Sequence, residues 1–159
     1  MSDNTRTIQQ TLLIASPPET VFRALTDPSE LSRWWTTRAK SDPRTGGSYE
    51  YVWEFANAAQ NGKQAGPYLE VVPGKRLRYP WEAGSEGKGH DTVVDFTFAK
   101  TAEGTRLELS HSGYKFGGDW EKAWEITNQA WGFFLGNLKA WLESGQDNRT
   151  AVLGQKTGT

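Results

Sequence analysis

The stretch from Asp119 to Ser144, DWEKAWEITNQAWGFFLGNLKAWLES, reads as one long helix. Asp119 is able to cap its first turn, and Gly145 follows its last turn, where glycine often ends helices. Apolar side chains recur at alternating spacings of three and four residues, which places them on one face. This stripe consists of Trp120, Trp124, Thr127, Trp131, Phe134, Leu138 and Trp141. The stretch therefore predicts a C-terminal helix roughly 37 Å long, at ~1.5 Å per residue, whose apolar face packs against the rest of the chain.

Upstream of this helix, residues 39–112 contain short segments of alternating apolar and polar side chains, separated by Gly, Pro and Asn. Such a pattern is typical of an antiparallel sheet and predicts about six strands here. In the clearest strand, residues 48–55, the aromatic side chains share one face while Glu50 and Glu54 point to the other. Further strands are expected at residues 68–72, 76–81, 92–100 and 106–112, with a turn at residues 62–66.

The N-terminal part adds one strand and two short helices. Residues 8–15 read as a strand that stops at the sequence SPPE. This tetrapeptide predicts a helix start, with Ser16 as the cap and Glu19 completing a capping box. The helix is expected to end before Pro28, and a second short helix to follow as far as Trp35. The whole order predicts an α+β domain, in which a curved antiparallel sheet of about seven strands wraps the long C-terminal helix.

Length and composition limit the organisation of the chain. Its 159 residues correspond to about one ordinary domain. We expect a single domain over residues 1–146 and a polar, flexible tail over residues 147–159. The chain has eight Trp, five Tyr and seven Phe, and each buried ring removes ~150 to 250 Å² from water. This is more aromatic surface than a minimal core requires, so some rings are available to line a pocket or an interface.

Charge and cysteine usage exclude several classes of function. The net charge of −1 and a sequence pI of about 6.1 argue against binding of nucleic acid, which requires a basic face. There is no cysteine, and therefore no disulfide and no thiolate nucleophile or ligand. The N-terminus lacks the pattern of a signal peptide, and no apolar run approaches the ~20 residues that span a membrane. We therefore expect a soluble, cytoplasmic protein without a membrane span.

Several segments carry a resemblance to a known superfamily. They are ASPPETVFRALTDP (residues 15–28), Leu31, Trp34-Trp35, GGSY (residues 46–49), YLEVVPGKRL (residues 68–77) and HSG (residues 111–113), followed by the Trp-containing helix. In these features the chain resembles the START-like SRPBCC superfamily and, within it, the group named after the activator of heat-shock protein 90 ATPase. The resemblance covers roughly residues 8–144. It implies a helix-grip fold, in which the sheet wraps the C-terminal helix and leaves a deep cavity.

The resemblance also implies a range of functions. In different members the cavity hosts lipids, polyketides, hormones or other apolar ligands, and some members are enzymes, including polyketide cyclases. The group's name suggests co-chaperone action on a heat-shock ATPase, an inference by association. In the eukaryotic activators a separate N-terminal domain makes major chaperone contacts, whereas only seven residues precede the first strand here. A small apolar molecule is the expected partner, a chaperone or a second copy of the chain is a further candidate, and no cofactor is expected.

The candidate ligand site is the concave face of the predicted sheet together with the facing side of the long helix. A mostly apolar concavity with a few polar groups is the usual form of a small-molecule site. For any single ring in this set, packing of the core is the favoured explanation, whereas the set as a whole favours a cavity. The candidate residues are Tyr49, Tyr51, Trp53, Phe55, Tyr68, Glu70, Tyr79, Trp81, Phe96, His111, Trp124, Asn128 and Trp131.

Catalysis has weaker support in the sequence. His90 and His111 are too far apart in the pattern to form a metal-ligand pair, so no metal site is expected. His111 follows the apolar face of its strand and is either a hydrogen-bonded core histidine or a general base. Glu70 would become an inward carboxylate near His111 if strand register allowed it. The Gly-rich segment at residues 84–89 lacks the phosphate-binding pattern and reads as a hairpin loop.

Three functions therefore remain open. The first is a binding module for a small apolar or aromatic ligand, which requires no catalytic residue. The second is a co-chaperone that stimulates a heat-shock ATPase. The third is an enzyme of the cyclase or lyase type that uses His111 or Glu70.

Overall fold

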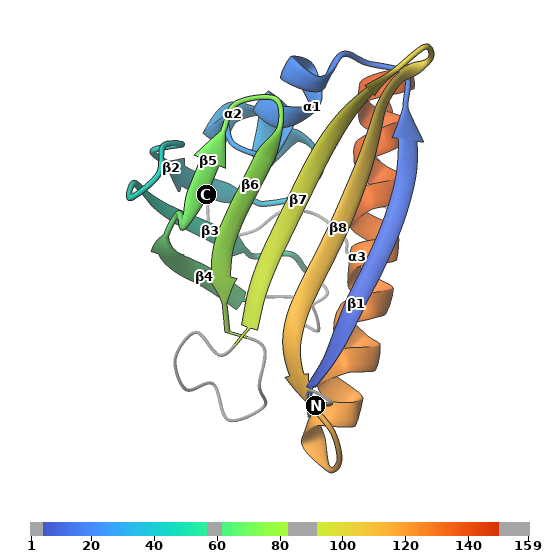
Figure 1. The fold of residues 1–159 in the computed structure, drawn as a ribbon. Coiled ribbons are helices and arrows are strands. Elements are labelled where there is room, and N and C mark those ends of the chain that lie inside the picture. Colours follow the sequence, from blue (N-terminus) through green and yellow to red (C-terminus); the bar gives the residue numbers. More distant parts are fainter. Residues whose placement is uncertain (1–4, 57–61, 83–91, 150–159) are drawn as a thin grey trace.

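The computed structural model describes residues 5–56, 62–82 and 92–149, which form an α+β fold with a long C-terminal helix (Figure 1). The elements are, in order, β1 (Thr5–Ile14), α1 (Pro18–Ala24), α2 (Pro28–Trp34), β2 (Arg38–Ser41), β3 (Ser48–Trp53), β4 (Gly62–Pro67), β5 (Glu70–Val72), β6 (Arg76–Trp81), β7 (Thr92–Thr101), β8 (Gly104–Lys115) and α3 (Asp119–Ser144). The predicted fold class and order of elements are confirmed. The loop predicted at residues 84–89 and His90 lie outside the described residues.

The strands are divided between two antiparallel sheets, a subdivision that the sequence did not predict. One sheet has five strands in the order β1-β8-β7-β6-β5, and the other has three in the order β2-β3-β4. In Figure 1, α3 runs along the β1–β8 side of the larger sheet, while the smaller sheet lies at its β5–β6 side.

β4 occupies the segment that was predicted to be a turn. It pairs along its whole length with β3, so that Gly62 lies opposite Trp53. The hydrogen bonds of this ladder outweigh the low strand propensity of a Gly-containing segment, because strand formation depends strongly on context. Tyr68 consequently lies between two strands, and β5 begins at Glu70.

The starts of α1 and α3 differ from the predicted caps. Pro17 precedes α1 in an extended conformation, and no side chain caps that helix. Ser16 contributes its main-chain carbonyl, not its side chain: the carbonyl accepts a hydrogen bond of 2.7 Å from Thr105 Oγ1. At α3, Asp119 is already the first helical residue, and Gly118 precedes it with a φ of +56°, in the region that favours glycine. The start of α1 is therefore anchored to β8 by a main-chain acceptor.

The centre of α3 is its most deeply buried part. The residues with the least exposure on this helix are Trp131, Phe134, Leu135, Asn137 and Leu138. Gly145 ends the helix with a φ of +68°, as the sequence predicted. Within the described ranges, no helix is both long enough and apolar enough to cross a membrane.

Residues 147–149, which the sequence analysis assigned to the polar tail, fold back onto α2. Arg149 is only 1% exposed, and its guanidinium donates to the carbonyls of Thr36 at 2.7 Å and Ser32 at 2.9 Å. The same group pairs with Asp147 at 2.9 Å, and Asp147 also accepts from Asn137 at 3.0 Å. The last carbonyls of a helix lack partners within the helix, so a guanidinium at the end of α2 satisfies them. The remaining tail, residues 150–159, lies outside the described part of the chain.

This contact predicts a large effect of a substitution near the C-terminus. Arg149→Met should lower the free energy of unfolding by about 2 to 4 kcal/mol, because it removes a buried guanidinium that donates to two carbonyls and carries the charge opposite Asp147. Urea denaturation checks this value. Arg106→Met is a matched control, because its pair with Glu108 is half-exposed and should contribute less than about 1 kcal/mol. Equal losses in the two variants would contradict the proposed role of Arg149.

Candidate functional site

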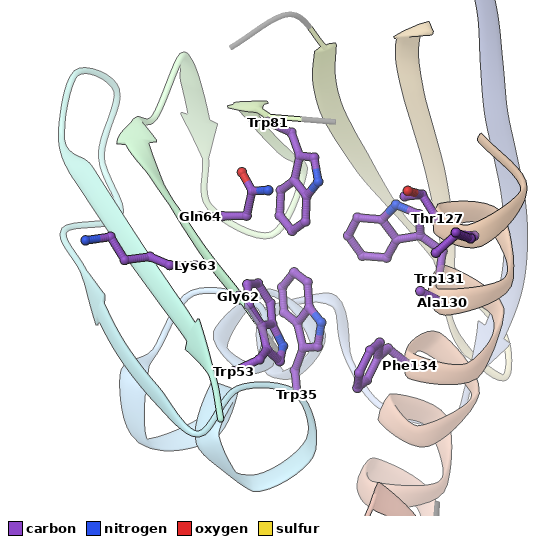
Figure 2. Close-up of a pocket in the computed structure, with 11 residues that line it drawn as sticks. Trp35, Trp53, Gly62, Lys63, Gln64, Trp81, Thr127, Ala130, Trp131 and Phe134 are labelled. Carbon is purple, nitrogen blue, oxygen red and sulfur yellow. The ribbon is translucent and has the colours of Figure 1, made fainter. Parts of the chain in front are cut away.

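Four tryptophan side chains from distant parts of the chain converge between α3 and the smaller sheet (Figure 2). Trp35 follows α2, Trp53 ends β3, Trp81 ends β6, and Trp131 lies in the middle of α3. The ring centroid of Trp35 lies 5.3 Å from those of Trp53 and Trp131 and 6.1 Å from that of Trp81. We term these four residues the indole cluster.

Local structure positions each of these rings. Trp53 and Trp81 lie on the inward faces of their strands, as alternation along β3 and β6 requires. Trp34 donates its indole N–H to the carbonyl of Ala24 at 2.8 Å, which ties α2 to α1. Trp35 stacks on the Trp34 ring with a centroid distance of 5.3 Å and an interplanar angle of 18°. The Trp35 ring is therefore held in place by its neighbour in the sequence.

A pocket of about 230 Å³ lies against the indole cluster. The pocket is otherwise lined by Gly62, Lys63, Gln64, Ile126, Thr127, Ala130 and Phe134. The amide of Gln64 is engaged in two hydrogen bonds with the main chain of Glu82, at 2.8 and 3.0 Å. The ammonium group of Lys63 points away from the indoles in Figure 2 and lies 3.3 Å from Glu50. The described part of the pocket surface is therefore largely aromatic and carries no carboxylate.

The spacing of the rings decides how a flat ligand fits. The rings of Trp35 and Trp81 are parallel, with centroids 6.1 Å apart. A ring inserted between two others needs about 7 Å, since each contact between carbon atoms takes roughly 3.5 Å. These two rings therefore leave no room for a third ring between them.

A chain of hydrogen bonds through His111 joins two walls of the pocket. The Trp131 indole N–H, which can only donate, bonds to His111 Nδ1 at 3.0 Å. Nδ1 is therefore the unprotonated nitrogen, and Nε2–H donates to Thr92 Oγ1 at 2.9 Å. The Thr92 hydroxyl in turn donates to the main-chain carbonyl of Trp81 at 2.7 Å. We term this the His111 relay; it connects α3 to the ends of β6 and β7.

The His111 relay leaves the imidazole without a free position for catalysis. His111 is fully buried, and this burial lowers its pKa from 6.5 to about 3. Both ring nitrogens are engaged within the protein, and the neutral form is the stable one. Among the residues that the structure describes, no three His, Asp or Glu side chains are grouped so as to hold a metal ion. Of the two readings of His111, the geometry favours a hydrogen-bonded core histidine.

A group of buried tyrosines lies next to the indole cluster. The hydroxyl of Tyr68 lies 2.7 Å from those of Tyr51 and Ser41, and Tyr49 donates to the carbonyl of Pro80. Burial raises the pKa values of the Tyr49, Tyr51 and Tyr68 phenols, so they stay neutral. The same holds for the fourth tyrosine, Tyr79, whose pKa burial also raises. These phenols pack the interior and do not supply a phenolate.

The structure brings together only part of the predicted ligand site. Trp53, Trp81 and Trp131 line the pocket. The predicted residues that are buried beside it without lining it are Tyr49, Tyr51, Phe55, Tyr68, Tyr79, Phe96 and His111.

Three predicted site residues lie elsewhere. Glu70 starts β5 and lies 3.6 Å from Arg76, so it does not approach His111; Tyr68 and Glu70 are not in one strand, and alternation does not apply. Trp124 lies under the Arg6 guanidinium, 3.9 Å from ring centroid to Cζ, because this part of α3 packs beside β1. Asn128 also faces β1, where its side-chain oxygen accepts from Gln10 at 3.1 Å.

The sequence analysis missed several residues of the pocket. Trp35 was noted only as part of a family motif, because its position after a short helix gives no periodicity from which to infer its direction. Thr127 and Phe134 belonged to the stripe on the long helix, but their place at the pocket was not predicted. Ala130 carries no sequence signal at all; its small side chain matters because it leaves space.

Comparison with known proteins gives a consistent relationship. A model of the family described as Activator of Hsp90 ATPase homolog 1-like protein matches residues 15–143. A protein from Mesorhizobium loti is 29% identical with a TM-score of 0.72, covering 89% of this chain and 99% of that one. A protein from Chromobacterium violaceum is 30% identical with a TM-score of 0.68, covering 86% and 96%.

A third solved structure, the Aha1 dimer from Colwellia psychrerythraea, is 22% identical with a TM-score of 0.74, covering 89% of this chain and 98% of that one. At this identity the similarity informs about the fold alone. None of the curated proteins matches the chain.

Burial of a neutral His111 predicts a specific dependence of stability on pH. In the unfolded chain a histidine has a pKa near 6.5, so it binds a proton that folded His111 does not bind until about pH 3. The free energy of unfolding should therefore fall as pH decreases, by about 1 kcal/mol between pH 6 and pH 5 from this residue. Urea denaturation of the wild type and of His111→Gln isolates the contribution. The same pH dependence in both proteins would contradict it.

Proposed function

The chain belongs to the Activator of Hsp90 ATPase homolog 1-like family, and from this membership and the pocket we propose that it binds a small, flat, apolar molecule without transforming it. The observation that carries the proposal is the indole cluster, which presents four rings to one pocket. Aromatic surface that faces a pocket, instead of closing it, is the usual lining of a small-molecule site.

The size of the pocket limits the ligand. At about 230 Å³ it is smaller than the ~300 to 1,000 Å³ of typical ligand sites. A compound with one or two fused rings suits this volume, and a long lipid chain does not. With about ten non-hydrogen atoms, such a ligand is expected to bind with a dissociation constant on the order of tens to hundreds of micromolar.

The chemistry of the neighbouring side chains supports binding over catalysis. A general base needs a free nitrogen or carboxylate within reach of the ligand. His111 uses both ring nitrogens in the relay, and Glu70 lies at the edge strand beside Arg76. Of the lining residues that the structure describes, Thr127 alone has a hydroxyl, and the one ionisable side chain among them, Lys63, is paired with Glu50. A cyclase or lyase reaction therefore has less support than binding.

Stimulation of a chaperone ATPase is the alternative function. This alternative is supported by the name of the family. The structure from Colwellia psychrerythraea adds no support, because at 22% identity it informs about the fold alone. On the binding proposal, we expect no acceleration of the ATP hydrolysis of a purified chaperone of the Hsp90 class, measured by phosphate release. Stimulation that persists in a variant with a filled pocket would favour the alternative.

The binding proposal predicts that filling the pocket removes binding. In Ala130→Phe the added ring occupies the space against the indole cluster, and the affinity for 1-methylnaphthalene should fall at least roughly tenfold, since the ligand loses most of its buried area. NMR titration of the tryptophan side-chain N–H signals measures this affinity and locates the site. The compound should be recovered unchanged.

Gln129→Phe is the matched control for this experiment. It adds the same ring to an exposed position of α3 that does not line the pocket, so affinity should remain as in the wild type. Equal binding by the wild type and Ala130→Phe would refute the pocket as the site.

A further inference from the structure

The tryptophans outside the pocket show a recurring arrangement. On α3, three indole rings each have a cationic side chain over them, which is a favourable interaction between the positive charge and the negative face of the ring. The pairs are Arg6 over Trp124 at 3.9 Å, Lys115 over Trp120 at 5.7 Å, and Arg33 over Trp141 at 5.7 Å. Each of these rings is partly exposed, so the chain supplies its own cation where an indole reaches the surface.

The indole cluster differs in this respect. Within the described ranges, no Lys or Arg side chain is placed over any of its four rings. Lys63 is the only charged residue among the lining residues that the structure describes, and its ammonium is directed away from the rings toward Glu50 (Figure 2). Among the described residues, the pocket therefore combines several aromatic rings with no cationic side chain placed over them.

The lining also restricts how a positive charge can be carried. Its described residues include no carboxylate, the carbonyl of Trp81 is used by Thr92, and the Gln64 amide is engaged with Glu82. A protonated amine would place N–H groups in this pocket with too few acceptors, and each unpaired donor is costly. A cation without N–H groups, whose charge is spread over a ring or over methyl groups, avoids that cost and still interacts with the aromatic faces.

We infer that the pocket selects a small organic cation without N–H donors, such as an N-methylated aromatic ring, over a neutral or anionic molecule of the same shape. This inference rests on the proposed function, because it specifies the charge of the ligand for the same pocket. Shape and apolar area give the affinity that all such molecules share, and the ring faces give the preference among them.

Three compounds of nearly equal shape test the inference: 1-methylquinolinium, 1-methylnaphthalene and 1-naphthoate, with charges of +1, 0 and −1. The cation should bind roughly five- to thirtyfold more tightly than the neutral compound, and the anion more weakly than both. NMR titration of the tryptophan side-chain N–H signals of the wild type gives the three dissociation constants under one set of conditions.

A pair of variants separates the ring faces from the general charge of the protein. Trp81→Leu keeps an apolar side chain but removes one indole of the cluster, and should reduce the preference for the cation at least roughly threefold. Trp124→Leu removes an indole away from the pocket and should leave that preference unchanged. The charge series in the wild type decides the question even if a variant does not fold.

The outcomes distinguish this inference from the proposed function. Equal affinities for the cation and the neutral compound, or tightest binding of the anion, would overturn the inference and leave the binding function standing. Failure of all three compounds to bind would overturn both. A preference for the cation that is unchanged in Trp81→Leu and lost in Trp124→Leu would assign it to another surface and overturn the inference.

Discussion

The indole N–H of Trp131 cannot be buried without an acceptor, and several elements are arranged to provide one. An unpaired buried donor costs about 1 to 3 kcal/mol, a large share of the stability of a small domain. His111 accepts this hydrogen bond through the lone pair of Nδ1, which requires the tautomer with its proton on Nε2. The Nε2–H group in turn donates to the hydroxyl of Thr92. Because Thr92 ends the relay on the carbonyl of Trp81, one tryptophan on α3 determines how three strands meet the helix.

The same constraint explains why a pocket exists at this place. Trp131 and Trp81 are held apart by the relay and cannot collapse onto each other beyond their ring contact of 5.7 Å. On α3, large side chains surround two small ones, Thr127 and Ala130, at the level of the indole cluster. A large, flexible side chain in place of Ala130 would fill this space. The pocket is thus the product of rigid walls and of two residues too small to fill the gap between them.

The sequence predicted the parts of the fold that periodicity encodes, and little beyond them. The long helix was recognisable because apolar side chains recur every three or four residues along it, and β3 because they recur at every second residue. Glu70 was misplaced because strand alternation holds only within one strand, and the boundary before β5 was not visible. Trp35 carries no periodic signal, since it follows a helix. Arg149 has the polar composition of a tail, and its burial depends on carbonyls more than a hundred residues away.

For the site, the sequence indicated aromatic residues of the correct kind, but three-dimensional register decided which of them line the pocket. Trp53, Trp81 and Trp131 were among the candidates, together with many rings that pack the core. Nothing in the sequence distinguishes an inward ring that packs against other side chains from an inward ring that lines a pocket. That difference depends on the size of residues across the gap, and therefore on contacts between elements distant in the chain.

The contact between Arg149 and α2 also sets an order of events during synthesis of the chain. The carbonyl of Thr36 emerges from the ribosome 113 residues before the guanidinium that will bind it. At ~5 to 20 residues per second, that interval lasts roughly 6 to 23 s. During this time the end of α2, and the Trp35 ring beside it, lack the cover that the finished fold gives them. The nascent domain therefore passes through a stage in which one side of its aromatic interior is exposed to solvent. At that stage it is also accessible to cellular proteins that bind exposed apolar surfaces.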